Sequence, residues 1–349
     1  MATIYDVSKR AGVSTATVSR VLNNNPKVDP DLRQQVMLAV SELRYVPNAS
    51  ARSLVTKQTY RVGLIISDIT NPFFAETARG AQDALDDRGY QLLLANSDDQ
   101  PQRELRYLGT FAQAGVDGLL IEPAMTGPQS VAGQRSAQRK LAKELEALGV
   151  PIVSYSPHKV AINADSVGID EELAGFKATD HLLNLGNRRI ALINGPTQNP
   201  VGIERAQGYR RALERHGVPF EADLTISTLF RQDEGYKALR SLLERGLAPT
   251  AVFAGDDQIA LGVLLALEEA GLAVPRDVAI VCVGDAQVTA ASRPSLTSVT
   301  VPRGYEFGRL GAQLLLERMG GAYTGAAREV VLETRLLIRD STATGLVSV

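Results

Sequence analysis

The pattern of apolar and polar positions changes near residue 60 of this 349-residue chain. Before that point, apolar residues recur every three or four positions in short segments, which predicts small amphipathic helices. After it, continuous apolar runs alternate with amphipathic segments, as in a parallel sheet that helices cover on both faces. The pattern therefore predicts a small all-α unit followed by a larger α/β unit.

The small unit is predicted to contain three helices. A helix that begins after Thr3 ends near Gly12, and Ser14 can cap a second helix over about 15–22. Asp29-Pro30 opens a third helix, because proline is well tolerated at the first helical position. Two short helices around a tight turn are typical of a helix-turn-helix, although two core helices with a solvated face give the same pattern.

A helix-turn-helix inserts its second helix into the major groove of DNA, where short or polar side chains permit a close approach. Arg20 can donate two hydrogen bonds to one guanine. Hydroxyl and amide side chains suit the phosphates on either side. We expect base contacts from Thr15, Ala16, Thr17, Ser19 and Arg20, and phosphate contacts from Tyr5, Ser14 and Asn23.

The charge of the chain is unevenly distributed. Residues 1–60 hold eight Lys and Arg against four Asp and Glu, whereas the rest of the chain holds 29 against 35. A positively charged first unit attracts the phosphates of DNA, and a negatively charged second unit does not. Chance clustering is the alternative explanation, because the excess is modest.

The second unit is predicted to contain two similar α/β halves with a cleft at the carboxyl ends of their strands. Arg188–Ile193 resembles Arg61–Ile66 and marks the start of the second half. The polar stretch 124–139 lacks apolar periodicity and is predicted to be a surface loop. Other strands are expected near 61–67, 90–95, 116–121, 151–155, 224–228, 250–254 and 278–283, and helices near 73–88, 102–114 and 136–148.

These patterns divide the chain into domains. We expect a helix-turn-helix domain over 1–47, a hinge helix and linker over 48–60, and a ligand-binding and dimerisation domain over 61–349. The last domain resembles the periplasmic-binding-protein architecture of two doubly wound parallel-sheet subdomains. The expected subdomains are about 61–160 with 293–323 and about 161–292 with 324–345.

Several motifs together resemble the lactose/galactose repressor family of bacterial transcription regulators. In the first unit they are Thr3-Ile4-Tyr5-Asp6-Val7, Ala11-Gly12-Val13-Ser14, Thr17-Val18-Ser19-Arg20-Val21 and Tyr45-Val46-Pro47-Asn48. In the second unit they include Asn71-Pro72-Phe73-Phe74 and Pro294-Ser295-Leu296-Thr297-Ser298-Val299. The resemblance covers nearly the whole chain and implies a regulator, most simply a repressor, that binds double-stranded operator DNA under the control of a small-molecule effector.

The resemblance also implies a hinge and a dimer. Residues 48–54 are expected to become helical on the operator, with Leu54 inserted between base pairs from the minor groove and Ala51 allowing two hinges to approach. The hinge residues expected at DNA are Asn48, Ala51, Arg52 and Leu54. A homodimer is expected because one such unit contacts half of a two-fold symmetric site, and the helix near 73–88 is expected at the interface. No heptad tail for tetramers is present, so we expect two subunits.

The effector residues are likewise implied by position within the family. Aromatic faces suit a sugar ring, an arginine can hold hydroxyl groups or a carboxylate, and acids accept hydroxyl hydrogens. Most relatives carry aspartate where this chain has Gly284. Either Asp285 reaches the cleft in its place through a remodelled turn, or the pocket recognises a ligand with different hydroxyl geometry. The resulting set is Phe73, Phe74, Asp170, Arg205, Phe230, Asp256 and Asp285, and the effector is expected to be a sugar, a sugar phosphate or a sugar acid.

Two other functional classes find less support. No phosphate-binding glycine loop, zinc-protease motif or nucleophile elbow is present, so we expect neither an enzyme nor a cofactor or metal. A protein that only carries a ligand would need an export signal and has no use for a basic helical unit. With no secretory leader and no run of about 20 apolar residues, the chain is expected to be cytoplasmic and independent of membranes. The single cysteine, Cys282, lies in an apolar run and is expected to be a buried thiol.

Overall fold

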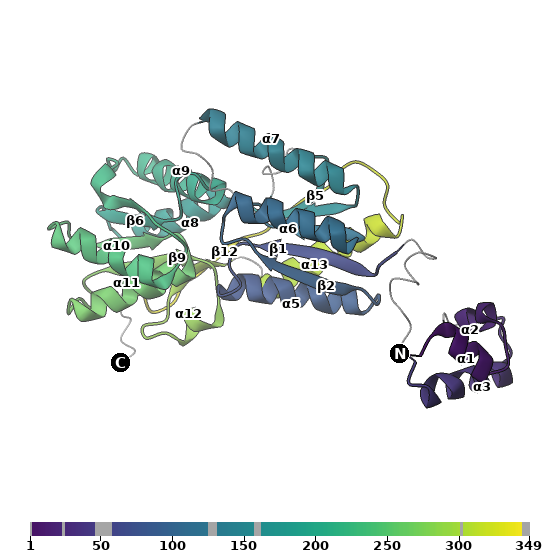
Figure 1. Cartoon of the computed structure of the whole chain (residues 1–349). Helices are drawn as coiled ribbons and strands as arrows, with labels where there is room; N and C mark the ends of the chain where they lie inside the picture. The colour runs from purple at the N-terminus through teal and green to yellow at the C-terminus, as the bar shows by residue number, and fades with distance from the viewer. Residues whose placement is uncertain are drawn as a thin grey trace. The chain divides into compact units, whose positions relative to one another are not determined.

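A computed structural model describes residues 2–22, 25–45, 58–124, 131–156, 162–300 and 303–343. The chain separates into two compact units, Met1–Thr59 and Tyr60–Val349. The small unit contains helices α1 (Ile4–Arg10), α2 (Thr15–Leu22) and α3 (Pro30–Glu42) (Figure 1). The fold class expected from the sequence, an all-α helix-turn-helix unit with an α/β unit, is confirmed.

The small unit is built by the caps and apolar positions that its sequence predicts. Thr3 and Asp6 form a reciprocal capping box at the start of α1, and Ser14 Oγ accepts a hydrogen bond from Thr17 N at 3.1 Å. Asp29 caps α3 by accepting hydrogen bonds from two backbone amides. The buried core joins all three helices and consists of Val7, Ala11, Val18, Val21, Val36 and Ala39.

The first sheet of the large unit runs β11-β5-β4-β3-β1-β2, with every neighbouring pair parallel. Its strands are β1 (Arg61–Ile66), β2 (Gln91–Asn96), β3 (Gly118–Ile121), β4 (Ile152–Ser154), β5 (Asp165–Ile169) and β11 (Glu329–Leu332). Helices α5 (Pro72–Asp86) and α13 (Gly304–Met319) cover one face, and α6 (Pro101–Ala114) and α7 (Val131–Leu148) cover the other (Figure 1).

The second sheet repeats this plan. Its order is β12-β10-β9-β8-β6-β7, and only the pairing of β10 with β12 is antiparallel among the described strands. The strands are β6 (Ile190–Asn194), β7 (Thr225–Ser227), β8 (Ala251–Ala254), β9 (Ala279–Val283), β10 (Thr297–Thr300) and β12 (Arg335–Leu337). One face carries α8 (Glu171–Asn184) and α9 (Pro200–Arg215), and the other carries α10 (Gln232–Glu244) and α11 (Asp257–Glu269). The short helices η1 (Ala222–Leu224) and α12 (Gln287–Ala291) lie in connections.

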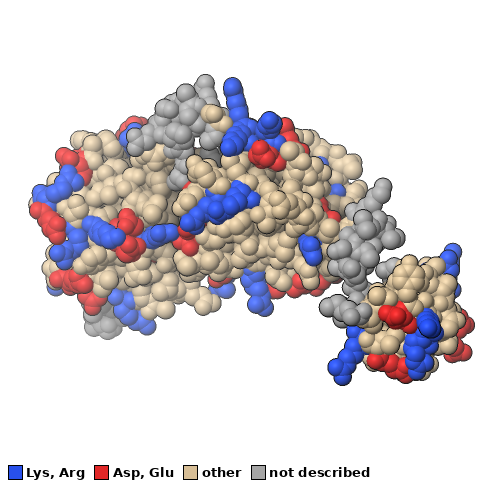
Figure 2. Space-filling view, in the orientation of Figure 1, with Lys and Arg blue, Asp and Glu red and all other residues tan. Residues whose placement is uncertain are grey.

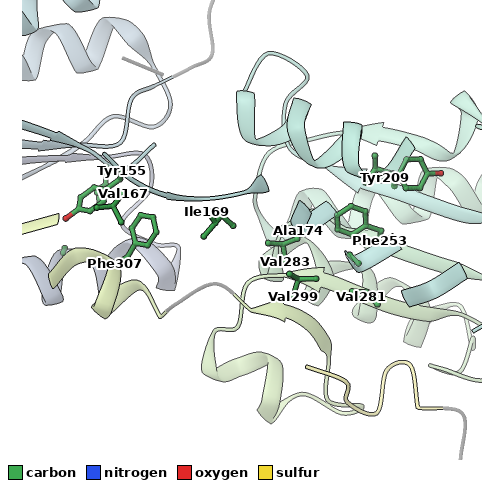
Figure 3. Packing of buried hydrophobic residues seen from close by; sticks show 14 of the residues in the cluster. Tyr155, Val167, Ile169, Ala174, Tyr209, Phe253, Val281, Val283, Val299 and Phe307 are labelled. Atoms are coloured by element: carbon green, nitrogen blue, oxygen red, sulfur yellow. The ribbon is translucent and has the colours of Figure 1, made fainter. Parts of the chain in front are cut away.

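Alternate residues of each strand enter different cores, as the two-residue period of a strand requires. In β1, Leu64 packs toward α5 and α13, while Ile65 packs toward α6 and α7. In the second sheet, Phe253 belongs to the core beneath α8 and α9, whereas Cys282 is buried in the core beneath α10 and α11. Figure 3 shows Tyr155 and Phe307 together in the first half, and Tyr209 with Phe253 in the second.

The chain crosses between the sheets at three places: after β5, between β10 and α13, and between β11 and β12. The expected subdomain segments differ from this arrangement. The sequence predicts β5 in the second subdomain, but it pairs with β4 in the first sheet. It predicts β10 in the first subdomain, but this strand pairs with β9 in the second sheet. The late strand β11 likewise joins the first sheet. The reason is that hydrogen-bond pairing, and not nearness in sequence, decides the sheet to which a strand belongs.

The surface loop expected over 124–139 is wrong for its second part. Helix α7 begins at Val131, and residues 125–130 lie outside the described part of the chain. The segment from 131 is rich in Ala, Gln, Arg and Lys, which have high intrinsic helix propensity, so a helix forms there without a regular apolar stripe. Among the described residues, no helix is long and apolar enough to cross a membrane.

Candidate functional site

A cavity of about 540 Å³ lies between the two sheets of the large unit. The segments that line it follow the carboxyl ends of strands from both sheets, which is where ligands bind in open α/β folds. Its volume is within the range of small-molecule sites. The cavity brings together all seven residues that the family resemblance implies: Phe73, Phe74, Asp170, Arg205, Phe230, Asp256 and Asp285.

Aromatic side chains form the wall that the first sheet contributes. Asn71 caps α5 and accepts a hydrogen bond from Phe73 N at 3.0 Å, which fixes the first turn of this helix beside the cavity. The Phe73 ring lies 5.4 Å from both Phe74 and Phe307, and the Phe307 ring lies 5.5 Å from Tyr155. This cluster presents apolar ring surface to a ligand, which suits the C–H face of a sugar.

Arg205 lines the cavity from the second half and is only 8% exposed. Its Nε and Nη2 each lie 2.7 Å from Glu171 Oε2, and its Nη1 donates to Gly255 O. Helices α8 and α9 approach closely here, because a Cβ on Gly175 would lie 2.3 Å from Arg205 O. Because residue 175 is glycine, α9 can approach α8 closely enough for Arg205 to reach Glu171.

Two consecutive carboxylates lie at the start of α11. Asp256 caps the helix by accepting a hydrogen bond from Gln258 N at 2.8 Å, and Asp257 accepts one from Ala286 N at 3.1 Å. Burial raises the pKa of Asp256, the neighbouring charge of Asp257 raises it further, and Arg205 opposes both effects. Burial likewise raises the pKa of Asp257. The positive charge of Arg205 thus acts on both carboxyls and lowers the pKa of each.

Asp257 also accounts for the departure at Gly284. The backbone of Gly284 has φ +105°, which favours glycine, and a Cβ there would lie 3.0 Å from Asp257 Oδ2. The Asp257 carboxylate therefore occupies the space beside position 284. Asp285 lines the cavity, but its Oδ1 accepts hydrogen bonds from Arg339 Nη2 at 2.7 Å and Thr289 Oγ1 at 3.1 Å.

An arginine outside the family-implied set joins the two halves across the cavity. Arg231, at the start of α10, lies 3.5 Å from Asp68 Oδ2 and 3.6 Å from Asp98 Oδ1, which follow β1 and β2. A second cavity of about 560 Å³ shares Asp68, Arg231 and two further lining residues, Asn71 and Phe230, with the first. Arg231 therefore lies where the two cavities meet.

Glu104 of α6 stabilises the turn after β3, which carries the lining residue Glu122. Glu104 is 1% exposed, and its carboxyl group accepts a hydrogen bond from Ala124 N. Burial raises the pKa of Glu104 to about 8, although the Ala124 bond opposes this effect. The native state therefore binds this proton more tightly than the unfolded chain does.

The change Glu104→Gln is expected to remove a pH dependence of stability. For a carboxyl with a raised native pKa, the free energy of unfolding falls as the pH rises from the unfolded value of 4.5 to about 8. Glutamine keeps an acceptor for Ala124 N and does not titrate, so between pH 5 and pH 8 the parent should lose roughly 3–4 kcal/mol more stability than the variant. Urea unfolding at pH 5 and pH 8 measures this difference, and equal slopes against pH in both proteins would contradict it.

The candidate DNA-binding helix α2 buries Val18 and Val21 and turns its other side to solvent. Ala16 and Arg20 are exposed, and Thr15, Thr17 and Ser19 are partly exposed. Tyr5 is 73% exposed, and the Ser14 and Thr17 hydroxyls lie 3.0 Å apart. Figure 2 shows Lys and Arg beside Asp and Glu on the face of the small unit that is in view. Asn23, Asn48, Ala51, Arg52 and Leu54 lie outside the described residues.

Comparison with known proteins decides the family. Residues 3–48 match the model of bacterial regulatory proteins of the lacI family, and residues 179–342 match a periplasmic binding protein-like domain. Catabolite control protein A of Priestia megaterium is 37% identical over 97% of this chain and 99% of its own length. This chain belongs to the lacI family. The expectation of a transcription regulator and not an enzyme is thereby confirmed.

Other lacI-family members are similar over nearly their whole length. The regulator CelR of Thermobifida fusca is 38% identical over 97% of this chain and 98% of its own, and the ribose operon repressor of Escherichia coli K12 is 35% identical over 91% and 93%. Among solved structures, a lac repressor dimer bound to operator has a TM-score of 0.82 at 25% identity, covering 98% of this chain and 99% of its own. A CelR–cellobiose complex has a TM-score of 0.70 at 35% identity, covering 98% and 100%.

Several residues around the cavity of this lacI-family chain were not found from its sequence. They are Tyr155, Glu171, Arg231, Asp257 and Phe307. Glu171 and Asp257 directly follow Asp170 and Asp256, so their place beside a family-implied acid is the signal in the sequence that points to them. Arg231 and Phe307 gave no local signal, because their place in the cavity depends on how the two sheets pack.

Proposed function

We propose that this chain is a cytoplasmic, homodimeric transcription regulator, acting as a repressor, whose affinity for operator DNA is controlled by a sugar-type effector. Residues 1–47 bind DNA, 48–60 form the hinge, and 61–349 bind the effector and the second subunit. The observation that carries the proposal is the cavity with seven family-implied residues, in a chain whose first 48 residues contain the lacI-family match.

Helix α2 supplies the sequence-specific contacts in this proposal. Its exposed face carries Arg20 for guanine and short side chains that permit close approach to base edges: Thr15, Ala16, Thr17 and Ser19. Tyr5, Ser14 and Asn23 bind phosphates, and the hinge residues Asn48, Ala51, Arg52 and Leu54 act in the minor groove. The positive charge of residues 1–60 supplies affinity that does not depend on sequence.

The effector binds in the cavity, where it stacks on Phe73, Phe74 or Phe230 and bonds to Arg205 and nearby acids. Support comes from two similar structures, the CelR–cellobiose complex and a regulator from Enterococcus faecium with bound ribose. The effector bridges the two halves of the large unit and so shifts their equilibrium between open and closed arrangements. The paired hinges transmit this shift to the operator by changing the fraction of dimers able to bind.

The dimer interface includes α5 and the neighbouring edge strand β2. Leu94 of β2 is 44% exposed and Ile69, in the turn before α5, is 38% exposed, which is apolar surface that a second subunit can cover. One helix-turn-helix contacts half of a symmetric operator, so two subunits are required for the full site.

Operator binding by the purified full-length protein tests this proposal. Genomic promoter fragments should be bound with a clear sequence preference, and affinity should fall steeply as salt rises because each neutralised phosphate releases counterions. Leu54→Ala should weaken binding to the selected operator by about 10-fold or more while leaving nonspecific binding unchanged, since only the specific complex contains the kink. Gel-shift titrations at two salt concentrations measure both effects. No preference for any sequence would contradict DNA-binding regulation, and unchanged operator affinity would contradict the role of Leu54.

A further inference from the structure

The charges of Arg205 and Arg231 are already balanced by acids of the protein. All three guanidinium nitrogens of Arg205 have partners in Glu171 or Gly255, and Arg231 lies between Asp68 and Asp98. Arg303 is exposed, so solvent screens its charge. Among the described lining residues there are thirteen Asp and Glu against these three arginines, and neither Lys nor His is present. The cavity is therefore strongly acidic.

Helix amino-termini commonly bind anions, and four of those at the cavity are already capped by side chains. Helices α5, α8, α9 and α11 begin at the cavity, and the residue before each accepts a hydrogen bond on its side chain from a first-turn amide. Helices α10, α12 and α13 also begin there and have no side-chain cap among the described residues. The capping residues are Asn71, Asp170, Asn199 and Asp256. Two of the caps are carboxylates, which neutralise the partial positive charge that a phosphate would seek.

The buried part of the cavity has an excess of acid as well. Glu171 takes two bonds from Arg205, which leaves Asp256 and Asp257 without a guanidinium of their own among the described ion pairs. Burial raises the pKa of both carboxyls, and nearby negative charge adds to this effect, because Asp257 raises the pKa of Asp256 and Asp285 raises that of Asp257. An anionic ligand placed there would add a further negative charge in a poorly solvated site.

We infer that the effector carries no anionic group: the cavity accepts a neutral sugar or an amino sugar and excludes sugar phosphates and sugar acids. This inference rests on the proposed sugar effector. It removes two of the three ligand classes that the sequence left open. The hydroxyl groups of a neutral sugar donate to the carboxylates, and an ammonium group gains from the same charges.

A matched ligand panel tests the inference. Full-length protein is titrated calorimetrically, at constant ionic strength, with neutral hexoses, pentoses and disaccharides, and with the phosphate ester, the acid and the amino derivative of each. For any sugar that binds, the phosphate and the acid should bind at least about 30-fold more weakly, whereas the amino derivative should lose no more than about 3-fold. A phosphate or acid that binds more tightly than its neutral parent overturns the inference.

Inorganic phosphate and two variants provide a measurement that does not require the effector to be known. Phosphate should raise the thermal unfolding temperature of the parent no more than chloride does at equal ionic strength. In Glu171→Gln, Arg205 loses its charged partner, so saturable stabilisation by phosphate should appear; Glu244→Gln, which alters an exposed pair with Arg240, should behave like the parent. If the parent binds phosphate saturably and Arg205→Met abolishes this binding, the inference that the cavity excludes anions is overturned. A panel in which no sugar binds contradicts instead the proposed effector, and the phosphate titration still decides the charge preference.

Discussion

Replacing Asp165 with asparagine is expected to lower the free energy of unfolding by about 3–5 kcal/mol, because it leaves two guanidiniums without their shared carboxylate. The side chain of Asp165 is fully buried at the start of β5. Its Oδ1 accepts from Arg318 Nη2 at 2.6 Å, and its Oδ2 accepts from Arg328 Nη2 at 2.7 Å. The centroid of the Tyr323 ring lies 4.5 Å from Arg318 Cζ and 4.0 Å from Arg328 Cζ.

This cluster supports the cavity as well as the fold. It ties β5 to α13 and to the residue that precedes β11, and both strands carry lining residues at Ile169 and Val331. Burial alone raises the pKa of Asp165, but the hydrogen bonds from Arg318 and Arg328 outweigh it and hold the pKa at about 2. A lowered carboxyl pKa contributes stability that is complete above the unfolded value of 3.8 and is lost as the pH falls toward 2. The difference between parent and variant should therefore shrink below pH 4.

Urea unfolding of the parent and of Asp165→Asn at pH 7 measures the loss of stability. The same experiment at decreasing pH shows whether the difference between the two proteins shrinks as expected. Asp233→Asn is the matched control, because Asp233 forms an ion pair with Lys237 in which both side chains are 62% exposed. That change should cost less than about 1 kcal/mol. A loss for Asp165→Asn no greater than that of the control would show that the cluster does not hold β5 and β11 in place.

The local features of the fold were predictable because they depend on neighbours in sequence. Thr3, Ser14 and Asp29 cap their helices as expected, and the apolar runs of β1 and β8 form central strands. The exchange of β5, β10 and β11 between the sheets was not predictable, because each is short and its partner is far away in the chain. Pairing across that distance is decided by the packing of whole sheets, for which the apolar pattern gives no register.

The cavity shows the same division. Motif positions led to Arg205 and Asp256, since a family resemblance preserves the place of a residue relative to its strand. Pattern could not show that Asp257 occupies the space beside Gly284, or that Asp285 is held by Arg339. It also gave no indication of Arg231, whose partners Asp68 and Asp98 follow strands of the other sheet. Each of these depends on a contact between segments that the sequence keeps apart.

Replacing Arg205 with methionine is expected to weaken effector binding by about 100-fold, because hydrogen bonds from a buried charged group contribute roughly 1.5–3 kcal/mol and Glu171 would remain without its cation. The variant should also bring Asp256 and Asp257 closer to full protonation, since the positive charge that lowers their pKa values is removed. Operator affinity without effector should stay within about twofold of the parent, because the change lies outside the DNA-binding unit. Gel shifts with and without the sugar identified from the ligand panel measure both quantities.

Two further variants separate a binding role from a structural one. Arg205→Lys keeps the positive charge but loses the planar group that bonds both to Glu171 and to Gly255 O, so its effector affinity should lie between those of the parent and the methionine variant. Arg210→Met removes an exposed arginine of the same helix that lies over the Phe220 ring, and it should leave the effector response intact. If Arg205→Met folds with the parent's thermal stability and still responds to the sugar at the parent's concentration, the effector does not depend on Arg205, and its binding site must be sought among the other residues of the cavity.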